Sequence, residues 1–407
     1  MGLSVVLPFL WHGARVFIPG SAAEFGPLTD YLLSDAVPPL QTTSSLVPGI
    51  NPVSVWPPRT GTTLASPFPF GAAGAQDTGA MRHMALSYFQ FDRDLAAQRF
   101  DLCVVQVAPP DAQGRASLGP SVEFTPTVLR GGARIIAVVN PNLPMMRGSA
   151  WIRLSDTAVV IDSDAPLRTY EAGAPRVEAT AIAKAVAGFI GDGATVQIGI
   201  GKVPGAPLRA LTDRSGLRLH SGMLSDGMQA LTAAGALDPA YQPTSCVHVG
   251  SAAHYDWLRG RDGIVVAPVS QTPHAPATLA AQPGLVAVSG ALSVDLFGQA
   301  NLDSIGSRAI SGVGGAADFA AAAARGNGVS IVVLPATDPK GSSRITAGQS
   351  GPVSLPRHDI DVIVTEYGAA DLRGACVMER AERLIAIAAP NHRSALTDQW
   401  RDIANRL

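Results

Sequence analysis

The sequence has few cysteines, little charge and no long apolar run. Its three cysteines, Cys103, Cys246 and Cys376, are widely spaced and form no CxxC pair. A disulfide framework and a cysteine-bound zinc ion are therefore excluded as organising features, and we expect a protein of the reducing cytoplasm. No apolar run reaches the roughly 18 residues of a membrane-spanning helix. The apolar start also lacks the basic region and cleavage pattern of a signal peptide, so we expect no membrane association.

Charge and metal ligands are also scarce. Charged residues make up 15% of the chain and the net charge is −2, against about 25% charged residues in an average protein. This composition gives no broad attraction for nucleic acid. The eight histidines show no HExxH or other ligand spacing, so we expect no metal site. What remains is a chain of 407 residues, 47% of them hydrophobic, which is long enough for two or three globular domains.

Short runs of β-branched and apolar residues, bounded by Gly, Pro or Asp, predict buried strands. Between these runs lie stretches with helical spacing, at Ala179–Phe189, Pro207–Thr212 and Val377–Ala388. Strands that alternate with helices indicate an α/β protein with largely parallel sheets. The predicted strands are Arg15–Ile18, Leu102–Val107, Arg134–Val139, Thr195–Ile200, Gly263–Val269, Leu285–Ser289, Ser330–Leu334 and Asp361–Thr365.

An internal echo indicates that the α/β unit occurs twice. Three short patterns recur in the same order, at Gly13–Gly20 and Gly193–Gly201, at Asp111–Ala116 and Asp295–Ala300, and at residues 132–139 and 328–334. We therefore predict two similar α/β domains, residues 1–180 and 181–407, because repeats of this length are domains rather than solenoid units. The Pro-, Ser- and Thr-rich region Pro48–Phe70 is interpreted as a surface loop or an oligomer arm.

Two glycine-rich segments are candidate ligand sites. Gly199-Ile-Gly-Lys-Val203 follows a predicted strand, so it is either a plain turn or a turn whose N–H groups bind a phosphate or carboxylate. The segment Ser311-Gly-Val-Gly-Gly315 precedes the predicted helix Asp318–Arg325. It is either a glycine turn or a loop whose N–H groups form an oxyanion hole.

Two polar segments could also carry chemistry. His, Ser and Asp occur together in His220–Gly227, but residues this close on one loop rarely reach triad geometry, and no GxSxG motif is present. Glu366 follows a buried strand, where α/β sheets place ligand-binding groups. A salt bridge or a cap is the alternative role for this carboxylate.

Taken together, the motifs resemble the acetyl-CoA hydrolase/transferase family, and within it the 4-hydroxybutyrate CoA-transferases. The resemblance runs from about Gly13 to His392. Its most specific stretches are Val294-Asp-Leu-Phe-Gly-Gln-Ala300, Ser311-Gly-Val-Gly-Gly315 and Val364-Thr-Glu-Tyr-Gly-x-Ala-Asp-Leu-Arg-Gly374. The resemblance implies an enzyme that acts on coenzyme A thioesters, with its active site in the cleft between two similar domains.

The resemblance also implies roles for the glycine segments. Residues Gly199, Ile200, Gly201, Lys202 and Val203 correspond to the family's CoA-binding turn, and residues Ser311, Gly312, Val313, Gly314 and Gly315 to its thioester-binding loop. CoA or acyl-CoA is then a substrate, with no tightly bound cofactor, and in the transferase alternative a small carboxylate such as acetate is the acceptor. We expect a homo-oligomer, a dimer.

The sequence departs from the family at the nucleophile. Members of the family attack the thioester with a glutamate in a segment H-S-E-M-x-S-D-G, whereas this chain has Gly222 at the glutamate position, between His220 and Gly227. Glycine cannot form an acyl-glutamyl anhydride. No glutamate lies between Glu178 and Glu366, so a shift of register does not supply one.

Three functions remain open from the sequence. The first is thioester hydrolysis by water, with His220, Glu123 or Glu366 as base and the loop at 312–315 as oxyanion hole. The second is CoA transfer with a displaced carboxylate, for which Glu24, Glu123 and Glu366 are candidates, or with direct attack by the acceptor acid. The third is acyl-CoA binding without catalysis.

Overall fold

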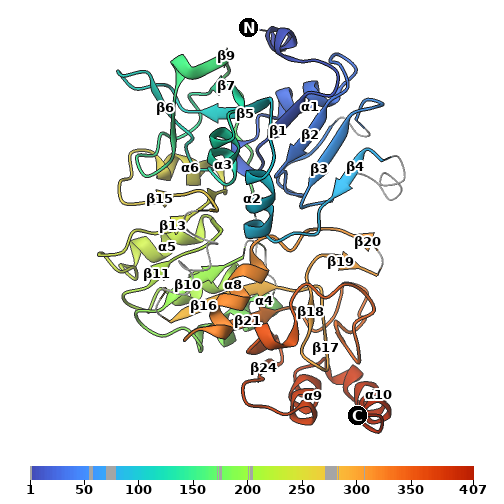
Figure 1. Ribbon diagram of the computed structural model, residues 1–407. Coiled ribbons are helices and arrows are strands. Elements are labelled where there is room, and N and C mark those ends of the chain that lie inside the picture. Colours follow the sequence, from blue (N-terminus) through green and yellow to red (C-terminus); the bar gives the residue numbers. More distant parts are fainter. Residues whose placement is uncertain are drawn as a thin grey trace.

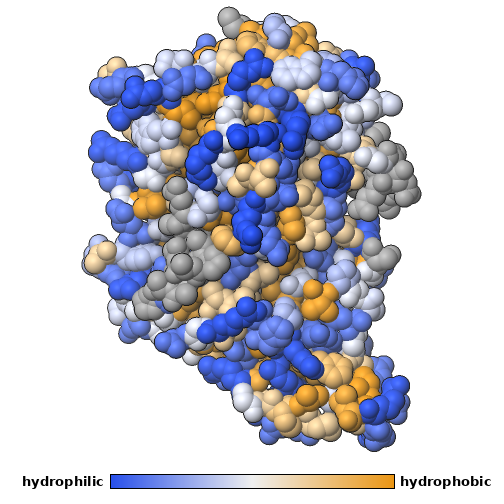
Figure 2. All heavy atoms as spheres, viewed as in Figure 1, coloured by the Kyte–Doolittle hydropathy of each residue, from blue (hydrophilic) through white to orange (hydrophobic). Residues whose placement is uncertain are grey.

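The computed structural model describes residues 2–54, 58–69, 79–171, 173, 177–199, 201, 205–270, 282, 284–306 and 308–407. Two β-sheets lie one above the other, with the N-terminus at one end of the molecule and the C-terminus at the other (Figure 1). We call the part built on the first sheet the N-terminal half and the part built on the second the C-terminal half. Polar residues cover most of the face shown in Figure 2.

The sheet of the N-terminal half has seven parallel strands in the order β4-β3-β2-β1-β5-β7-β9. The strands are β1 (Arg15–Ile18), β2 (Gln41–Ser44), β3 (Thr63–Ser66), β4 (Met81–His83), β5 (Leu102–Val107), β7 (Arg134–Val139) and β9 (Thr157–Asp162), and the helices are α1 (Gly26–Leu33), α2 (Tyr88–Ala96) and α3 (Thr125–Arg130). A two-stranded ribbon, β6 (Arg115–Ser117) with β8 (Trp151–Arg153), lies at its edge. The central strands β5 and β7 are almost entirely buried, as expected for apolar runs covered on both faces.

The sheet of the C-terminal half has the order β11-β10-β16-β21-β23-β24, and only β24 is antiparallel to its neighbour. The strands are β10 (Thr195–Ile198), β11 (Arg218–Leu219), β16 (Leu285–Gly290), β21 (Val329–Val333), β23 (Val362–Thr365) and β24 (Gly368–Asp371). The helices are α4 (Val177–Ala187), α5 (Gly227–Ala233), α6 (Ala252–Leu258), α8 (Ala316–Arg325), α9 (Val377–Ala386) and α10 (Arg393–Ala404). Short strands complete this half, at β12 (Met223–Leu224), β13 (Thr244–Ser245), β14 (Val247–His248), β15 (Val265–Val266), β17 (Ser293–Asp295), β18 (Ala300–Asn301), β19 (Ser304–Ile305), β20 (Arg308–Ala309) and β22 (Ile345–Thr346).

The two sheets share one topology. The order β2-β1-β5-β7-β9 in the first corresponds to β11-β10-β16-β21-β23 in the second, strand for strand along the chain. The repeated patterns at residues 13–20 and 193–201 include β1 and β10, and those at 132–139 and 328–334 include β7 and β21. The predicted fold class, two similar α/β units with largely parallel sheets, is therefore confirmed. The domain boundary at 180/181 stays a prediction, and residues 174–176 beside it lie outside the described residues.

Several predicted elements differ from the structure. The region Pro48–Phe70, interpreted as a loop or an oligomer arm, contains β3, which pairs with β2 and β4 on its two sides. Within β3, Ser66 is buried and Thr63 is half-buried. A side-chain hydroxyl also binds the backbone of β3: Thr42 Oγ1 of β2 donates to the Thr63 carbonyl oxygen (2.6 Å). The predicted strand Gly263–Val269 is reduced to Val265–Val266, and the predicted helix Pro207–Thr212 is a 3₁₀-helix at Ala206–Leu211.

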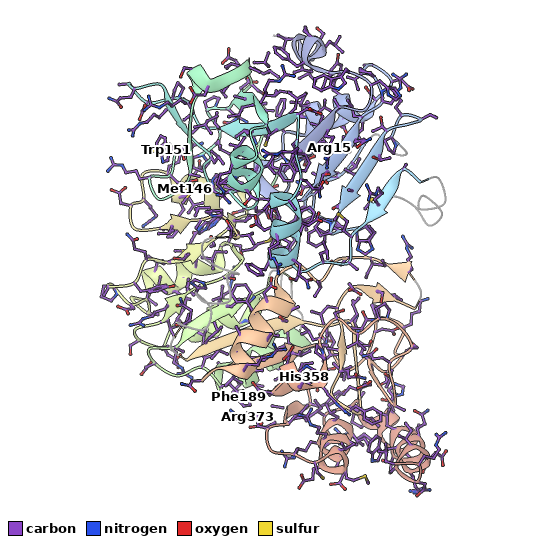
Figure 3. The ribbon with its side chains drawn as sticks, viewed as in Figure 1. Arg15, Met146, Trp151, Phe189, His358 and Arg373 are labelled. Carbon is purple, nitrogen blue, oxygen red and sulfur yellow. The ribbon has the colours of Figure 1, made fainter. Side chains whose placement is uncertain are left out.

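The two halves pack through a shared core. Part of the C-terminal half lies on the N-terminal one, where Val122 N donates to Cys246 O (3.0 Å) and His248 N to Pro120 O (2.7 Å). A single apolar cluster contains side chains of both halves, among them Phe124 and Val247. Figure 3 shows side chains filling both halves, with Arg15 and Trp151 in the N-terminal half and Phe189 and Arg373 in the C-terminal half. In the part of the chain described, no helix is long and apolar enough to cross a membrane.

Candidate active site

A cavity of about 360 Å³ lies where the two halves meet. The N-terminal half contributes Val47, Pro48, Ile50, Phe68, Tyr88 and Tyr170, and the C-terminal half contributes Gln197, Ile198, Gly199, Gly222, Met223, Ser289, Gly290, Leu302, Phe319 and residues 311–316. The structure thus brings together Gly199, Gly222 and Ser311–Gly315, which are far apart in the sequence. Ile200, Lys202 and Val203, also predicted to bind CoA, lie outside the described residues.

A larger cavity of about 800 Å³ adjoins the first. Tyr170, Ile198, Gly199 and Met223 line both cavities. Gly201 lines only the larger one, and so do the two basic residues Lys184 and Arg209. Gly199 therefore lies between a smaller and a larger cavity, an arrangement with room for a long ligand.

The glycine loop, residues 311–315, is fixed by contacts with the N-terminal half. Tyr88 N donates to Gly314 O (2.9 Å). Just beyond the loop, Asp318 accepts from Ser87 Oγ (2.6 Å) and from Phe89 N (3.1 Å). The N–H groups of residues 312–314 make no hydrogen bond to any described residue. These donors are therefore available for a ligand oxygen.

Two glycines of the loop are required by geometry. A Cβ on Gly312 would lie 2.0 Å from the Pro67 carbonyl oxygen, so no larger residue fits beside that backbone. Gly314 has a φ of +56°, a conformation that favours glycine. The loop's close approach to the N-terminal half thus depends on both missing side chains.

Gly222 lies in the wall of the cavity, directly before β12. Its carbonyl oxygen accepts from the N–H groups of Cys246 (3.0 Å) and Val247 (3.2 Å). Unlike Gly314, it does not have a positive φ. A side chain at position 222 is therefore compatible with the backbone conformation found there.

Glu123 is buried behind the cavity wall in an unusual backbone conformation. Glu123 (φ 37°) and Ser21 (φ 51°) are the two described non-glycine residues with positive φ, and Ser21 Oγ donates to Glu123 Oε1 (3.3 Å). Ser45 Oγ donates to Oε2 (3.0 Å), and Tyr88 Oη lies 3.4 Å from Oε1 as a third donor. Strain of this kind persists where neighbouring structure enforces it, often at functional sites.

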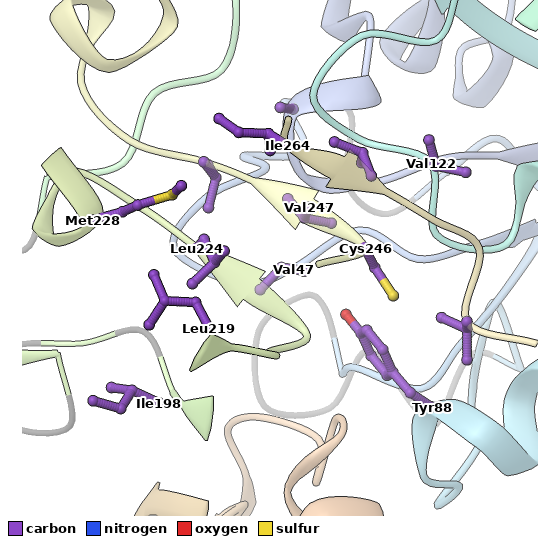
Figure 4. Close-up of a cluster of buried hydrophobic side chains, with 14 of the residues drawn as sticks. Val47, Tyr88, Val122, Ile198, Leu219, Leu224, Met228, Cys246, Val247 and Ile264 are labelled. Atoms are coloured by element: carbon purple, nitrogen blue, oxygen red, sulfur yellow. The ribbon is translucent and has the colours of Figure 1, made fainter. Parts of the chain in front are cut away.

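Burial raises the pKa of Glu123 to about 7, although the hydrogen bonds from Ser45, Ser21 and Tyr88 act to lower it. Tyr88 lines the cavity, and its Oη lies 3.4 Å from Glu123 Oε1. Figure 4 shows the Tyr88 hydroxyl among buried side chains, on the side of Val47 and Cys246. The Tyr88 hydroxyl therefore connects the Glu123 carboxyl to a side chain of the cavity wall.

The other predicted site residues do not line either cavity. His220 is buried, with Nδ1 2.9 Å from Tyr241 Oη and its ring against Phe319. Glu366 Oε2 accepts from Ala336 N (2.8 Å). Glu24 pairs with Arg168 Nε (2.7 Å) and accepts from Asn51 Nδ2 (2.7 Å). Glu123 lies within hydrogen-bond distance of the cavity-lining Tyr88, and the ring of His220 contacts the cavity-lining Phe319.

Sequence reasoning missed four polar residues of the smaller cavity: Tyr88, Tyr170, Gln197 and Ser289. Gln197 and Ser289 interrupt apolar strand runs, and that interruption was the signal available. Tyr88 begins a helix and belongs to no motif. Among the described residues, no group of three or more His, Cys, Asp and Glu is placed to hold a metal ion.

Comparison with known proteins identifies relatives in both sequence and fold. Residues 75–167 and 250–400 match the N-terminal and C-terminal domain models of acetyl-CoA hydrolase/transferase. A succinyl-CoA:acetate/propanoyl-CoA:succinate CoA transferase of Fasciola hepatica is 34% identical over 73% of this chain, and the match covers 65% of that protein, slightly less than two thirds of its length. A 4-hydroxybutyrate coenzyme A transferase of Clostridium kluyveri is 33% identical over 74% of this chain and 72% of its own length. An acetyl-CoA hydrolase of Kluyveromyces lactis is 34% identical over 50% of this chain and 40% of its own length.

Solved structures agree with these relatives. RipA from Yersinia pestis superposes with a TM-score of 0.89 at 25% identity, covering 99% of this chain and all of its own. A 4-hydroxybutyrate CoA-transferase from Porphyromonas gingivalis superposes with a TM-score of 0.80 at 26% identity, covering 100% of this chain and 97% of its own. The identity to the clostridial transferase, the two matched domain models and the shared fold lead to one conclusion: the chain is an enzyme of the acetyl-CoA hydrolase/transferase family.

Proposed function

We propose that this enzyme hydrolyses acyl-CoA thioesters in the smaller cavity without forming a covalent glutamyl intermediate. The observation that carries the proposal is the set of residues that line this cavity. The glycine loop and Gly222 line it together, and no carboxylate side chain is among its described lining residues. This wall supports the proposal, because the N–H groups of the loop would bind the thioester oxygen, whereas the glutamate of the family's covalent mechanism is replaced by Gly222.

In this mechanism water attacks the thioester carbonyl carbon. The water proton passes to Tyr88 Oη as the Tyr88 proton passes to Glu123, and the N–H groups of the glycine loop bind the developing oxyanion. The C–S bond then breaks, and the proton returns along the same path to the departing thiolate. The products are the free carboxylic acid and CoA, and Glu123 is again a carboxylate.

A pKa near 7 suits Glu123 to this role, because a general base works best when its pKa is close to the working pH. The 3.4 Å separation from Tyr88 Oη is long, as is common for catalytic hydrogen bonds without substrate. The larger cavity, with Lys184 and Arg209 on its wall, is proposed to receive the phosphate-bearing part of CoA.

CoA transfer to a small carboxylate such as acetate is the second candidate function, because several relatives are named as CoA transferases. Binding of acyl-CoA without turnover is the third. A cytoplasmic location and a homodimeric state remain predictions from the sequence.

One experiment separates the three functions. The protein is incubated with acetyl-, propionyl- and butyryl-CoA, with and without acetate, while free thiol and acyl exchange are followed. We expect free CoA to appear without an acceptor. Exchange that requires acetate would establish the transferase instead, and binding without either product would establish the non-catalytic role.

A further inference from the structure

The two sides of the smaller cavity carry different groups. The N-terminal half presents Val47, Pro48, Ile50 and Phe68, which we call the apolar side, together with the phenols of Tyr88 and Tyr170. The C-terminal half presents the glycine loop, Gln197 and Ser289, beside apolar residues such as Leu302 and Phe319. A ligand in this cavity therefore meets aliphatic and aromatic side chains on one side, and N–H groups, an amide and a hydroxyl on the other.

Two polar atoms on the C-terminal side have no hydrogen-bond partner in the described part of the chain. Gln197 is 6% exposed and Ser289 is 4% exposed, and neither Gln197 Oε1 nor Ser289 Oγ makes a hydrogen bond to a described residue. The two residues lie on the adjacent parallel strands β10 and β16. Buried polar atoms in folded proteins are nearly always satisfied, so this pair indicates a polar ligand group.

The described wall of the cavity offers no counter-charge to a charged ligand. Among its described lining residues, the cavity has no Asp, Glu, Lys or Arg. A free carboxylate at the end of the acyl chain, as in succinyl-CoA, would be buried there without a counter-charge, which is strongly unfavourable. The buried Glu123 carboxyl behind Tyr88 would add repulsion to that cost.

We infer that the cavity selects CoA thioesters whose acyl chain is uncharged and apolar, an inference that rests on the proposed acyl-CoA function. The acyl chain lies against Val47, Ile50 and Phe68. Gln197 and Ser289 bind the amide of the pantetheine arm, which is separated from the thioester sulfur by two carbons. Gln197 Oε1 accepts from the amide N–H, and Ser289 Oγ donates to the amide carbonyl.

The first test is acyl selectivity in the unmodified protein. Dissociation constants for butyryl-CoA and succinyl-CoA are measured by calorimetry, and turnover is measured separately. We expect butyryl-CoA to bind at least tenfold more tightly. Equal affinities, or tighter binding of succinyl-CoA, would overturn the inference whether or not the protein hydrolyses either compound. Selective binding without hydrolysis would instead overturn only the hydrolase proposal.

The second test uses cavity-wall variants. Val47→Ala removes two methyl groups from the apolar side and should raise the affinity for hexanoyl-CoA relative to butyryl-CoA several-fold. Val16→Ala makes the same deletion at a buried position in a different apolar cluster, so it serves as the control and should leave that ratio unchanged. A ratio that moves equally in both variants would contradict the assignment of the acyl chain to this wall.

Gln197→Met tests the polar side, because methionine is of similar size but cannot accept as Gln197 Oε1 does. We expect Gln197→Met to weaken the binding of butyryl-CoA and of hexanoyl-CoA by the same factor, about fivefold or more. The ratio of the two dissociation constants should not change. We expect Ser289→Ala to weaken the binding of both thioesters in the same way. If Gln197→Met folds with a wild-type melting temperature and binds both thioesters as tightly as wild type, the pantetheine assignment is wrong.

Discussion

At position 222 the cavity wall has no side chain, although the backbone there does not require glycine. Gly222→Glu should therefore place a carboxylate where the family resemblance implies the nucleophile. We expect this variant to form a glutamyl-CoA adduct and to transfer CoA to acetate. Borohydride trapping followed by mass spectrometry should find the adduct in the segment 220–227 of the variant and not in wild type.

Two outcomes would contradict this account of Gly222. A folded Gly222→Glu protein that binds acyl-CoA but yields no adduct would show that more of the transferase site is lost than one side chain. A wild-type adduct on Glu24, Glu123 or Glu366 would move the nucleophile to that residue.

Glu123 makes the rate depend on pH in a defined direction. Its carboxyl must be ionised to accept a proton, and burial raises its pKa to about 7. The rate of hydrolysis should therefore fall as the pH drops below about 7 and level off above it. Glu123→Gln should abolish this fall of the pH–rate profile near pH 7 and lower the rate at pH 8 by about 100-fold or more.

Glu24→Gln is the matched control for Glu123→Gln. Glu24 is also buried, and burial also raises its pKa, but its hydrogen-bond partners include Arg168 and Asn51 rather than Tyr88. We expect the pH–rate profile of Glu24→Gln still to fall below about pH 7. A pH–rate profile that Glu123→Gln leaves unchanged would remove Glu123 from the proton path.

At the scale of elements, the glycine loop and the start of α2 act as one unit. Gly312→Ala should distort the loop, because the new Cβ would lie 2.0 Å from Pro67 O. We expect at least a tenfold loss in kcat/KM for acyl-CoA. Gly191→Ala is the control, since a Cβ there meets nothing within 4 Å and Gly191 also lacks a positive φ.

Gly314→Val extends the same test to a position with positive φ. Gly341→Val provides comparable backbone strain at a φ of +86°, also in open space, and should leave kcat/KM unchanged. If the two loop variants were as active as their controls, the loop would have no part in binding the thioester.

At the scale of the whole molecule, the cavity exists only while the halves stay docked. Asp318 joins them through Ser87 Oγ and Phe89 N. Asp318→Ala should lower the free energy of unfolding by about 1–3 kcal/mol, because it leaves two donors unpaired. It should also raise KM, since α8 follows the glycine loop directly.

Asp359→Ala is the control for that variant. It breaks the ion pair with Arg325 at the other end of α8, within the C-terminal half. We expect reduced stability with an unchanged KM, measured by denaturant unfolding and steady-state kinetics. A KM increase of the same size in both variants would mean that general destabilisation, and not docking of the halves, is responsible.

The sequence by itself determined the parallel α/β units, because uninterrupted apolar runs such as β5 and β7 can be buried only inside a covered sheet. The sequence also identified the two glycine-rich segments as candidate ligand sites, since glycine permits close backbone approaches that other residues exclude. The tertiary structure alone decided that β3 joins the sheet, because its polar residues become stable only when neighbouring strands supply hydrogen bonds. It alone decided that Glu123, Tyr88, Gln197 and Ser289 gather around Gly222 and the glycine loop, because burial and proximity arise from the packing of distant segments.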